Sequence, residues 1–232
     1  MKFELKNNHM IVSVNTKTGS KTCIFDTGAP YTFFFENIKE YYIDGISWKV
    51  EYNPMFSYFA KFRVQIENMI GCHIDGFIGT DCMKGKCVVI NFINQELSIS
   101  SSDMNEGIGV SMNHIYGLPI FEMSINGIAV NSAFDSGAMF SFIDSNLIHQ
   151  LQLKPQGRNY KDFNPLLGAF TASLYTGNIY VGTTELEERN IAVSPAYDRA
   201  MSMIGVDAFI GIDSLKETVL CLSYINNRIA II

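Results

Sequence analysis

The stretch Ile24-Phe25-Asp26-Thr27-Gly28-Ala29 is the most informative part of this sequence, because a close copy follows as Ala133-Phe134-Asp135-Ser136-Gly137-Ala138. In both copies an apolar segment ends at an aspartate, and a small hydroxyl residue, a glycine and an alanine come next. Glycine adopts backbone conformations that other residues rarely take, so each copy predicts a strand that delivers its aspartate to a tight turn. One such motif is most often an ordinary turn. Two copies in matching surroundings indicate a common role.

A second pair of similar segments lies farther along the chain. Residues 77–84 (FIGTDCMK) match residues 209–216 (FIGIDSLK), and the match continues to the C-terminus at the same offset of 132. The two aspartates are 109 residues apart, so the second half holds 23 more residues between its two motifs. A repeat of this extent indicates that a whole lobe is duplicated. We therefore predict an N-terminal lobe at residues 1–102, a linker at 103–114 and a C-terminal lobe at 115–232.

These motifs together resemble the pepsin/retropepsin superfamily of aspartic peptidases. The shared pattern is an apolar strand ending in Asp-Thr/Ser-Gly-Ala, then two apolar residues with a glycine, a short helix and a last strand. Residues 140–155 resemble the strand and helix that follow the catalytic motif in the retropepsin-like branch. The alanine after each motif glycine, where pepsins usually carry serine, is also similar to that branch. The resemblance implies a mainly all-β, bilobal fold with two pseudo-twofold-related β lobes and a few short helices. Retropepsins build their site from two identical chains, whereas this chain holds both halves, which implies a monomer.

The resemblance implies an aspartic endopeptidase, a hydrolase, with Asp26 and Asp135 as its catalytic dyad. Two carboxyls about 3 Å apart cannot both ionise easily, so they share one proton. One then acts as a general base toward water, while the other acts as a general acid and polarises the carbonyl. By the family pattern, the hydroxyls of Thr27 and Ser136 reach across the twofold axis and lock the turns together. The residues expected to support the dyad are Thr27, Gly28, Ala29, Ser136, Gly137 and Ala138.

The residues beside the aspartates also predict the pH range. Ala29 and Ala138 offer no hydroxyl to the carboxyls, so fewer donors stabilise the ionised form than in a pepsin. We therefore predict activity at weakly acidic to neutral pH.

The walls of the cleft and its cover are predicted from aromatic and glycine-containing segments. The longer second half is expected to carry a flap hairpin near residues 165–176, and the first half to lack a full flap or to have a short one near 48–56. Apolar walls favour apolar side chains in a peptide or protein substrate. The residues expected to bind substrate are Tyr31, Trp48, Met139, Phe140, Gly168 and Phe170, with Phe33 as a further wall residue.

Local patterns predict several other elements. Residues 118–134 predict a hairpin around Asn126-Gly127, because Asn-Gly between apolar runs is a strong turn signal. Alternating apolar residues predict strands at 63–69 and 201–204. The aromatic segment 48–62 predicts a hairpin, and helical spacing at 145–153 predicts a helix.

Two acidic residues follow the second motif glycines and could be mistaken for catalytic groups. Asp81 and Asp213 each stand before a predicted short helix, and aspartate is a favoured N-cap residue. We therefore expect both to cap helices. The four histidines show no metal-ligand spacing, so we expect no metal site and no cofactor.

Composition excludes some classes of function. The formal net charge is −6 and no basic run is present, which argues against binding to nucleic acid. Residues 1–14 lack the apolar core of a signal peptide, and no apolar run of about 18 residues could span a membrane. With five cysteines at irregular spacing, these features predict reduced thiols and a cytoplasmic location. The alternative to an enzyme is a peptide-binding module that keeps the cleft and does not cleave.

Overall fold

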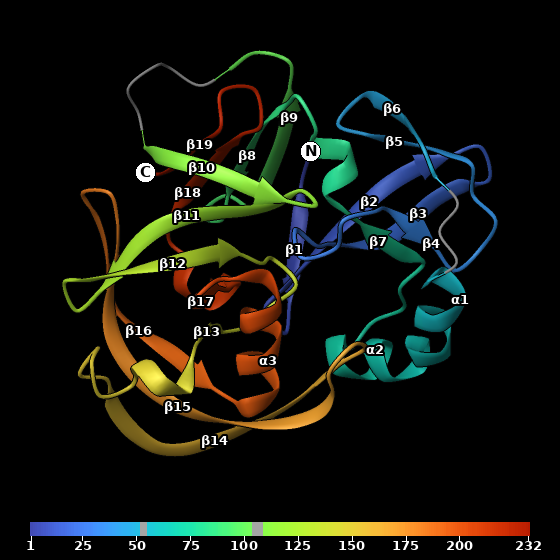
Figure 1. Cartoon of the computed structure of the whole chain (residues 1–232). Helices are drawn as coiled ribbons and strands as arrows, with labels where there is room; N and C mark the ends of the chain where they lie inside the picture. The colour runs from blue at the N-terminus through green and yellow to red at the C-terminus, as the bar shows by residue number, and fades with distance from the viewer. Residues whose placement is uncertain (52–54, 104–108) are drawn as a thin grey trace.

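The computed structural model of the 232-residue chain describes residues 1–51, 55–103 and 109–232. In these residues the prediction of a mainly β protein is confirmed, because strands dominate and form two curled sheets with short helices beside them (Figure 1). Part of the predicted linker, residues 104–108, lies outside the described residues, and its end from Val110 onward belongs to a strand.

The first sheet is built from the N-terminal half. Its seven strands are β1 (Phe3–Lys6), β2 (His9–Thr16), β3 (Gly19–Phe25), β4 (Phe33–Phe34), β5 (Glu40–Ile43), β6 (Ile46–Lys49) and β7 (Gly76–Ile78). They lie in the order β4-β7-β3-β2-β5-β6, and β1 pairs with β2. In β2, Val12 and Val14 are buried and Ser13 between them is exposed. This alternation is typical of a strand with one face on the core.

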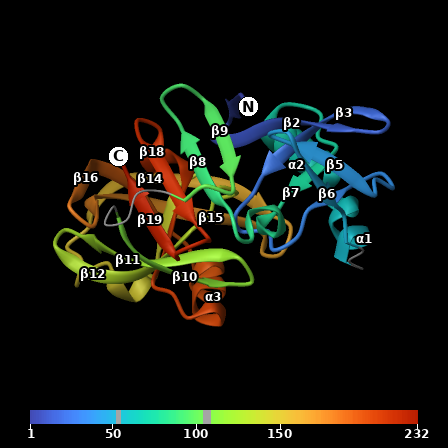
Figure 2. The same cartoon turned by 90° about the horizontal axis from the view of Figure 1, so that it is seen from above.

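The second sheet has twelve strands and takes one hairpin from the N-terminal half. Its strands are β8 (Cys87–Asn91), β9 (Glu96–Ser100), β10 (Val110–Ile115), β11 (Leu118–Ile125), β12 (Ile128–Phe134), β13 (Ser141–Ile143), β14 (Lys154–Asn164), β15 (Gly168–Val181), β16 (Thr184–Val193), β17 (Ala208–Ile210), β18 (Val219–Ser223) and β19 (Arg228–Ile231). They lie in the order β14-β15-β16-β13-β17-β12-β11-β10-β19-β18-β8-β9. The antiparallel pairing of β8 with β18 joins the two halves. Figure 2 shows the hairpins to which these strands belong, β8–β9 and β18–β19, in the middle of the molecule.

The helices are short. They are α1 (Met55–Phe59), α2 (Arg63–Ile70) and α3 (Pro195–Ile204), with 3-10 turns η1 (Ala60–Phe62), η2 (Thr80–Met83), η3 (Ser145–Leu147) and η4 (Ile212–Leu215). The largest hydrophobic cluster contains residues of both halves. A smaller cluster packs α2 against the first sheet, and another packs α3 against the second.

One four-strand arrangement, which we call the frame, occurs in both sheets. The order β4-β7-β3-β2 in the first sheet corresponds to β13-β17-β12-β11 in the second. The strand that leads to the motif aspartate, β3 or β12, pairs in parallel with β7 or β17. The other neighbour of β7 is β4 and that of β17 is β13, and both of these pairs are antiparallel. The repeat seen in the sequence is therefore also a repeat of the fold.

Two predicted strands are helices in the structure. The prediction at 63–69 is wrong because α2 occupies that segment, with Ile66 and Ile70 buried four residues apart on one face. The prediction at 201–204 is wrong because these residues end α3. Both helices stop at a glycine with positive φ, Gly71 at 81° and Gly205 at 82°. Glycine tolerates this left-handed conformation and is common after helix ends.

Two further predictions of local structure are also wrong. The expected hairpin at 48–62 does not form, since β6 ends at Lys49 and α1 begins at Met55, with residues 52–54 outside the described part. The expected helix at 145–153 is reduced to η3, and irregular turns follow it. The apolar face expected for that helix was Leu147, Ile148 and Leu151. Leu151 is buried, and Leu147 and Ile148 are half-buried against the same cluster, although the backbone is not a regular helix. The hairpin predicted at 118–134 is confirmed as β11 and β12.

Among the described residues, no helix combines the length and apolar character that crossing a membrane requires. None of the five cysteines, all of which the structure describes, forms a disulfide. Burial raises the pKa of the Cys23 and Cys82 thiols, which keeps both protonated.

Candidate active site

Asp26 and Asp135 follow the ends of two strands in matching positions. β3 and β12 each lie between an antiparallel hairpin partner and a parallel strand. The backbone N–H of Asp26 donates to the carbonyl of Ile78 at 2.9 Å, and that of Asp135 donates to Ile210 at 3.0 Å. The parallel strands therefore fix where both turns begin.

The two carboxyls face each other across the turns. A side-chain carbon added to Gly28 would lie 2.6 Å from Oδ1 of Asp135, and one added to Gly137 would lie 2.6 Å from Oδ1 of Asp26. Each carboxyl also accepts a hydrogen bond at 2.8 Å from the glycine N–H of its own turn. Glycine is required at both positions because any side chain would occupy the place of the opposite carboxyl.

The hydroxyl residues of the motifs connect the two turns. The Thr27 hydroxyl donates to the carbonyl of Phe134 at 2.9 Å and accepts from the N–H of Ser136 at 2.9 Å. The Ser136 hydroxyl donates to the carbonyl of Phe25 at 2.8 Å and accepts from the N–H of Thr27 at 2.9 Å. These four bonds are buried and reciprocal. They hold the turns together, as the sequence pattern predicts.

The surroundings of the carboxyls favour their neutral form. Burial, together with repulsion from Asp135, raises the pKa of Asp26 to about 8. Burial also raises the pKa of Asp135, although hydrogen bonds from Gly137 and Asp26 oppose the change. The two carboxyls titrate as one pair, and the raised pKa of Asp26 keeps a proton on the pair at neutral pH. Such a pair contains an acid and a base within one site.

A second pair of hydroxyl residues supports the turns from behind, and the sequence analysis missed it. The Thr32 hydroxyl accepts from the N–H of Gly79 at 3.0 Å, and the Ser141 hydroxyl accepts from Gly211 at 3.1 Å. Both hydroxyl residues stand six positions after their aspartate. This equal spacing could have identified them. Side-chain carbons at the two glycines would collide with the backbone, which explains why glycine follows each apolar pair.

The predicted capping role of Asp81 and Asp213 is wrong. The N-caps of η2 and η4 are Gly79 and Gly211, and the two aspartates lie inside the 3-10 turns. Asp81 instead accepts hydrogen bonds from the Thr32 hydroxyl at 2.7 Å and from the Thr32 N–H at 2.9 Å. The Asp81 carboxyl therefore holds Thr32, whose hydroxyl accepts the hydrogen bond from Gly79.

Asp75 and Asp207 form another matched pair that was not foreseen. Asp75 accepts from the N–H of Thr22 at 2.8 Å, and Asp207 accepts from the N–H of Asn131 at 2.9 Å. The first bond joins the residue before β7 to β3, and the second joins the residue before β17 to β12. These aspartates therefore support structure away from the dyad.

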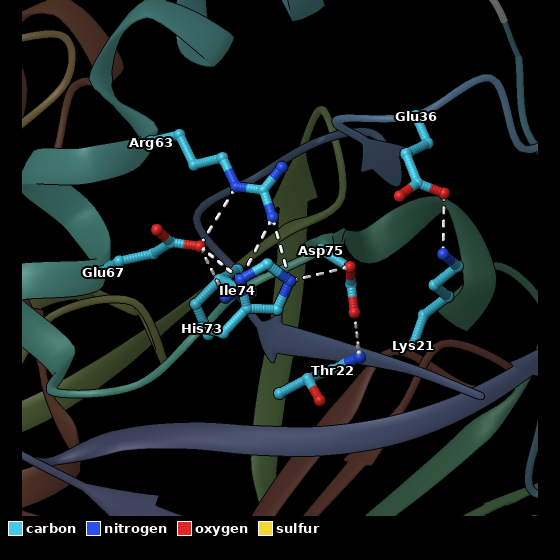
Figure 3. A network of polar contacts seen from close by, with 8 residues as sticks. All are labelled: Lys21, Thr22, Glu36, Arg63, Glu67, His73, Ile74 and Asp75. Atoms are coloured by element: carbon cyan, nitrogen blue, oxygen red, sulfur yellow. Dashed lines mark hydrogen bonds and ion pairs between the residues drawn. The ribbon is translucent and has the colours of Figure 1, made fainter.

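In the first half, Asp75 belongs to a larger polar network (Figure 3). Glu67 accepts from Arg63 Nε and from the N–H of Ile74, both at 3.0 Å. His73 lies between two carboxylates, with Nδ1 at 3.0 Å from Oε1 of Glu67 and Nε2 at 3.2 Å from Oδ1 of Asp75. The hydrogen bond from Ile74, with help from Arg63, lowers the pKa of Glu67. Beside this network, Lys21 pairs with Glu36 at 2.7 Å. The network ties α2 to β3 on the surface.

A cavity of about 360 Å³ lies against the dyad. Apart from Asp135 and Gly137, the second half contributes only Asn164, Pro165 and Leu166, which lie at the tip between β14 and β15. The remaining lining comes from the first half, namely Asp26, Gly28, Ala29, Pro30, Tyr31, Phe33, Phe56, Phe59 and Phe77. The cavity therefore joins two carboxyls to an aromatic wall, a combination typical of ligand sites.

The hairpin tip reaches the cavity from the second half. Tyr58 of α1 donates its hydroxyl to the carbonyl of Pro165 at 3.3 Å, and the rings of Phe62 and Phe163 lie 5.4 Å apart. Leu166 lines the cavity and is 63% exposed. The hairpin that was predicted as a flap near 165–176 is therefore β14–β15, whose tip contacts α1 and η1 of the other half.

Some predicted substrate-binding residues lie at the cavity and others beside it. Tyr31 lines the dyad cavity, whereas Trp48 lines a neighbouring cavity of about 920 Å³ to which Tyr31 also contributes. Gly168 begins β15 at the base of the hairpin tip, with φ at 79°. Phe33 lines the dyad cavity, as predicted for a wall residue.

The remaining three predicted residues pack within the second half. Phe140 contacts the ring of Tyr160, with centroids 4.8 Å apart. Phe170 packs with Phe142 in the cluster under α3. Met139 is half-buried, and its carbonyl accepts from the N–H of Asp213 at 3.1 Å. None of these three residues lines the dyad cavity.

A scan of the chain against protein-family models and a search of curated proteins both return no match. Within the described residues, no cluster of three or more His, Cys, Asp or Glu side chains is placed to hold a metal ion. The functional conclusion therefore depends on the geometry of the two turns and the cavity.

Proposed function

We propose that this protein is an aspartic endopeptidase, which hydrolyses peptide bonds with a water molecule activated by Asp26 and Asp135. The observation that carries the proposal is the reciprocal packing of the turns, in which each carboxyl lies against the glycine of the opposite turn. Two half-buried carboxyls that face each other destabilise a fold, because partial loss of solvent and mutual repulsion oppose their ionisation. Strongly shifted carboxyls in a cavity are typical of functional sites.

We also propose that the fold is of the bilobal pepsin/retropepsin type, with both lobes in one chain. The repeated four-strand frame supports this assignment. The exchange of equivalent hydrogen bonds between Thr27 and Ser136 is the pattern that a pseudo-twofold axis between the turns would produce. Because one chain supplies both turns, a monomer would hold a complete site.

In the proposed reaction the dyad begins with one proton. The ionised carboxyl removes a proton from water while the water oxygen attacks the carbonyl carbon of the scissile bond. The protonated carboxyl donates its proton to the carbonyl oxygen, which gives a tetrahedral intermediate. The C–N bond then breaks as one dyad carboxyl gives its proton to the nitrogen and the other removes a proton from a hydroxyl of the intermediate, which becomes the product carboxyl. One water is consumed, and the dyad returns to its one-proton state.

The cavity would hold the peptide chain between the dyad and the hairpin tip. Pro165 and Leu166 lie at that tip, and aromatic residues of the first half form the opposite wall. A peptide in this position would displace water from around the carboxyls. Exclusion of water strengthens the electrostatic interactions on which the proton transfers depend.

The test is a digest of denatured casein and of an unbiased peptide library from pH 4 to 8, with products identified by mass spectrometry. We expect cleavage by the wild type and inhibition by pepstatin. Asp26→Asn and Asp135→Asn should each lower kcat/KM by roughly 10³-fold or more, because each removes an acid–base group. Asp144→Asn is the matched control, since the Asp144 carboxylate accepts local hydrogen bonds from Asn146 and lies away from the dyad cavity. Equal loss of activity in this control would contradict the assignment.

The alternative is a peptide-binding module that does not cleave. One observation favours it, because no residue of the short β5–β6 hairpin lines the dyad cavity. Only β14–β15 would then cover a bound peptide. If fluorescence anisotropy shows that the wild type binds library peptides without cleaving any of them, the alternative holds and the peptidase proposal fails.

A further inference from the structure

We infer that the site selects a large apolar or aromatic side chain of its substrate on one side of the scissile bond only, the side held by the first half. The inference rests on the proposed peptidase function and deepens it. It follows from a comparison of equivalent positions in the two halves, which line the dyad cavity in the first half and are covered by Tyr197 in the second.

In the first half the equivalent positions are the paired residues Phe33 of β4 and Phe77 of β7. Both line the dyad cavity, together with Phe56 and Phe59 of α1. The rings of Phe56 and Phe59 stack on Phe33 with centroids 5.2 and 5.4 Å away, and Phe77 stacks at 4.8 Å. Four rings held by mutual stacking form a stable apolar wall. An apolar side chain placed against them would lose contact with water, which favours its binding.

In the second half the equivalent pair is Phe142 of β13 and Phe209 of β17. Tyr197 of α3 stacks directly on Phe142, with centroids 3.6 Å apart and an angle of 4° between the rings. It also contacts Phe209 and Phe170, with centroids 5.8 and 5.4 Å away. Tyr197 is 5% exposed and Phe142 is 1% exposed. The protein's own tyrosine therefore fills the space that a substrate side chain would need.

The difference arises from the residues that the two equivalent helices carry. α2 and α3 end at Gly71 and Gly205, whose N–H groups bond to the carbonyls four residues earlier. Eight residues before these glycines stand Arg63 in the first half and Tyr197 in the second. Arg63 binds Glu67 and contacts His73 in the surface network of Figure 3, so it does not cover Phe33.

The chemistry of the wall defines the occupant. Phe33, Phe56, Phe59 and Phe77 present aromatic carbon, and among the described residues that line the cavity only the two dyad aspartates are ionisable carboxylic acids. A basic side chain would have to lose its hydration against this apolar wall, and an acidic one would also be repelled by the ionised dyad. We therefore expect Phe, Tyr, Leu or Met of the substrate to occupy the cavity.

The test is the sequence preference of the cleavage sites in a peptide library digested by the whole wild-type chain. We expect selection of large apolar residues by about tenfold to hundredfold at one position next to the scissile bond. The position on the other side of the bond should show no comparable selection. Equal selection on both sides would overturn the inference and leave the peptidase function intact, whereas absence of any cleavage would overturn the function itself.

Variants of the two walls give an independent readout. Phe59→Trp should reduce the space in the cavity and shift the selected residue toward smaller side chains, and Phe59→Ala should shift it toward larger ones. Tyr197→Ala should create selection for a large side chain on the opposite side of the bond. Exposed residues serve as controls, Val64→Ala on α2 and Met203→Ala on α3. If Tyr197→Ala does not fold, the Phe59 pair still decides, because an unchanged preference in both variants would contradict the inference.

Discussion

The two halves of this protein have the same frame and different coverings. Each frame carries an aspartate turn between equivalent strands, and the bonds that support the turns occur in matching pairs. Outside the frame the halves diverge, because the first carries α1 and η1 whereas the second carries the long strands β14, β15 and β16. The comparison shows that the turns and their supporting bonds, which both halves must contribute to the site, are the same in the two halves. The coverings, which only one half needs to supply, are free to differ.

The largest expected effect tests the equality of the turns. Gly28→Ala and Gly137→Ala should each lower kcat/KM by about 100-fold or more, because the new methyl group would displace the opposite carboxyl. The losses should be similar, since a side-chain carbon at either glycine would lie 2.6 Å from Oδ1 of the opposite aspartate. Steady-state kinetics on one peptide measures both variants. A harmless substitution at one of the two positions would break the equivalence of the turns.

The next effect concerns the hydroxyl bonds between the turns. Thr27→Val and Ser136→Ala each leave a buried N–H and a buried carbonyl without a partner. We expect each to lower the free energy of unfolding by about 2–4 kcal/mol, measured by urea denaturation. The double variant should lose less than the sum, because both substitutions remove the same network. Ser173→Ala, at an exposed position on β15, is the control.

The shared proton predicts how activity and stability depend on pH. The pKa of Asp26 is raised to about 8, so the acid form of the pair persists through neutral pH and is lost above it. We expect kcat/KM to fall above about pH 8, in agreement with the weakly acidic to neutral range that the alanines predict. A profile with its maximum below about pH 3 would contradict this interpretation.

The same shift has a defined sign in stability. A carboxyl whose pKa is raised in the folded state adds most to the free energy of unfolding below its unfolded-state pKa of 3.8. This contribution is lost as pH rises toward 8. Asp26→Asn should therefore be more stable than the wild type at pH 7, by on the order of 2 kcal/mol. At pH 4 the difference should nearly vanish. Thermal unfolding at the two pH values measures it, and a destabilised variant at pH 7 would contradict the burial of a shared charge.

The smallest effect compares the two supporting aspartates. Asp75→Asn and Asp207→Asn each weaken one equivalent bond to a backbone N–H, so each should cost about 1 kcal/mol. Asp75 also contacts His73 in the surface network, which solvent screens, so its variant should lose at most slightly more. Urea denaturation of both variants provides the comparison. A much larger loss in one half would show that the supports are not equivalent.

The frame and the dyad could be predicted because their signals are local and occur twice. A strand, a turn glycine and a hydroxyl residue lie within six positions of each other, so the pattern around Asp26 and Asp135 is visible without the fold. The supports at Thr32 and Ser141 were visible in the same way, through their equal spacing, and were overlooked. The segment 63–70 could not be assigned from sequence because its apolar residues fit both a strand and a helix, and packing against the first sheet decided in favour of α2.

The sequence by itself determined that this chain carries a repeated pattern with two equivalent aspartate turns, because neighbouring residues specify strands, turns and their glycines. Only the tertiary structure decided that Tyr197 stacks on Phe142, that Phe56 and Phe59 line the dyad cavity, and that the β14–β15 tip reaches α1. These features depend on contacts between segments far apart in the chain. Which side chain fills a given space depends on the packing of several elements at once, and no local pattern records it.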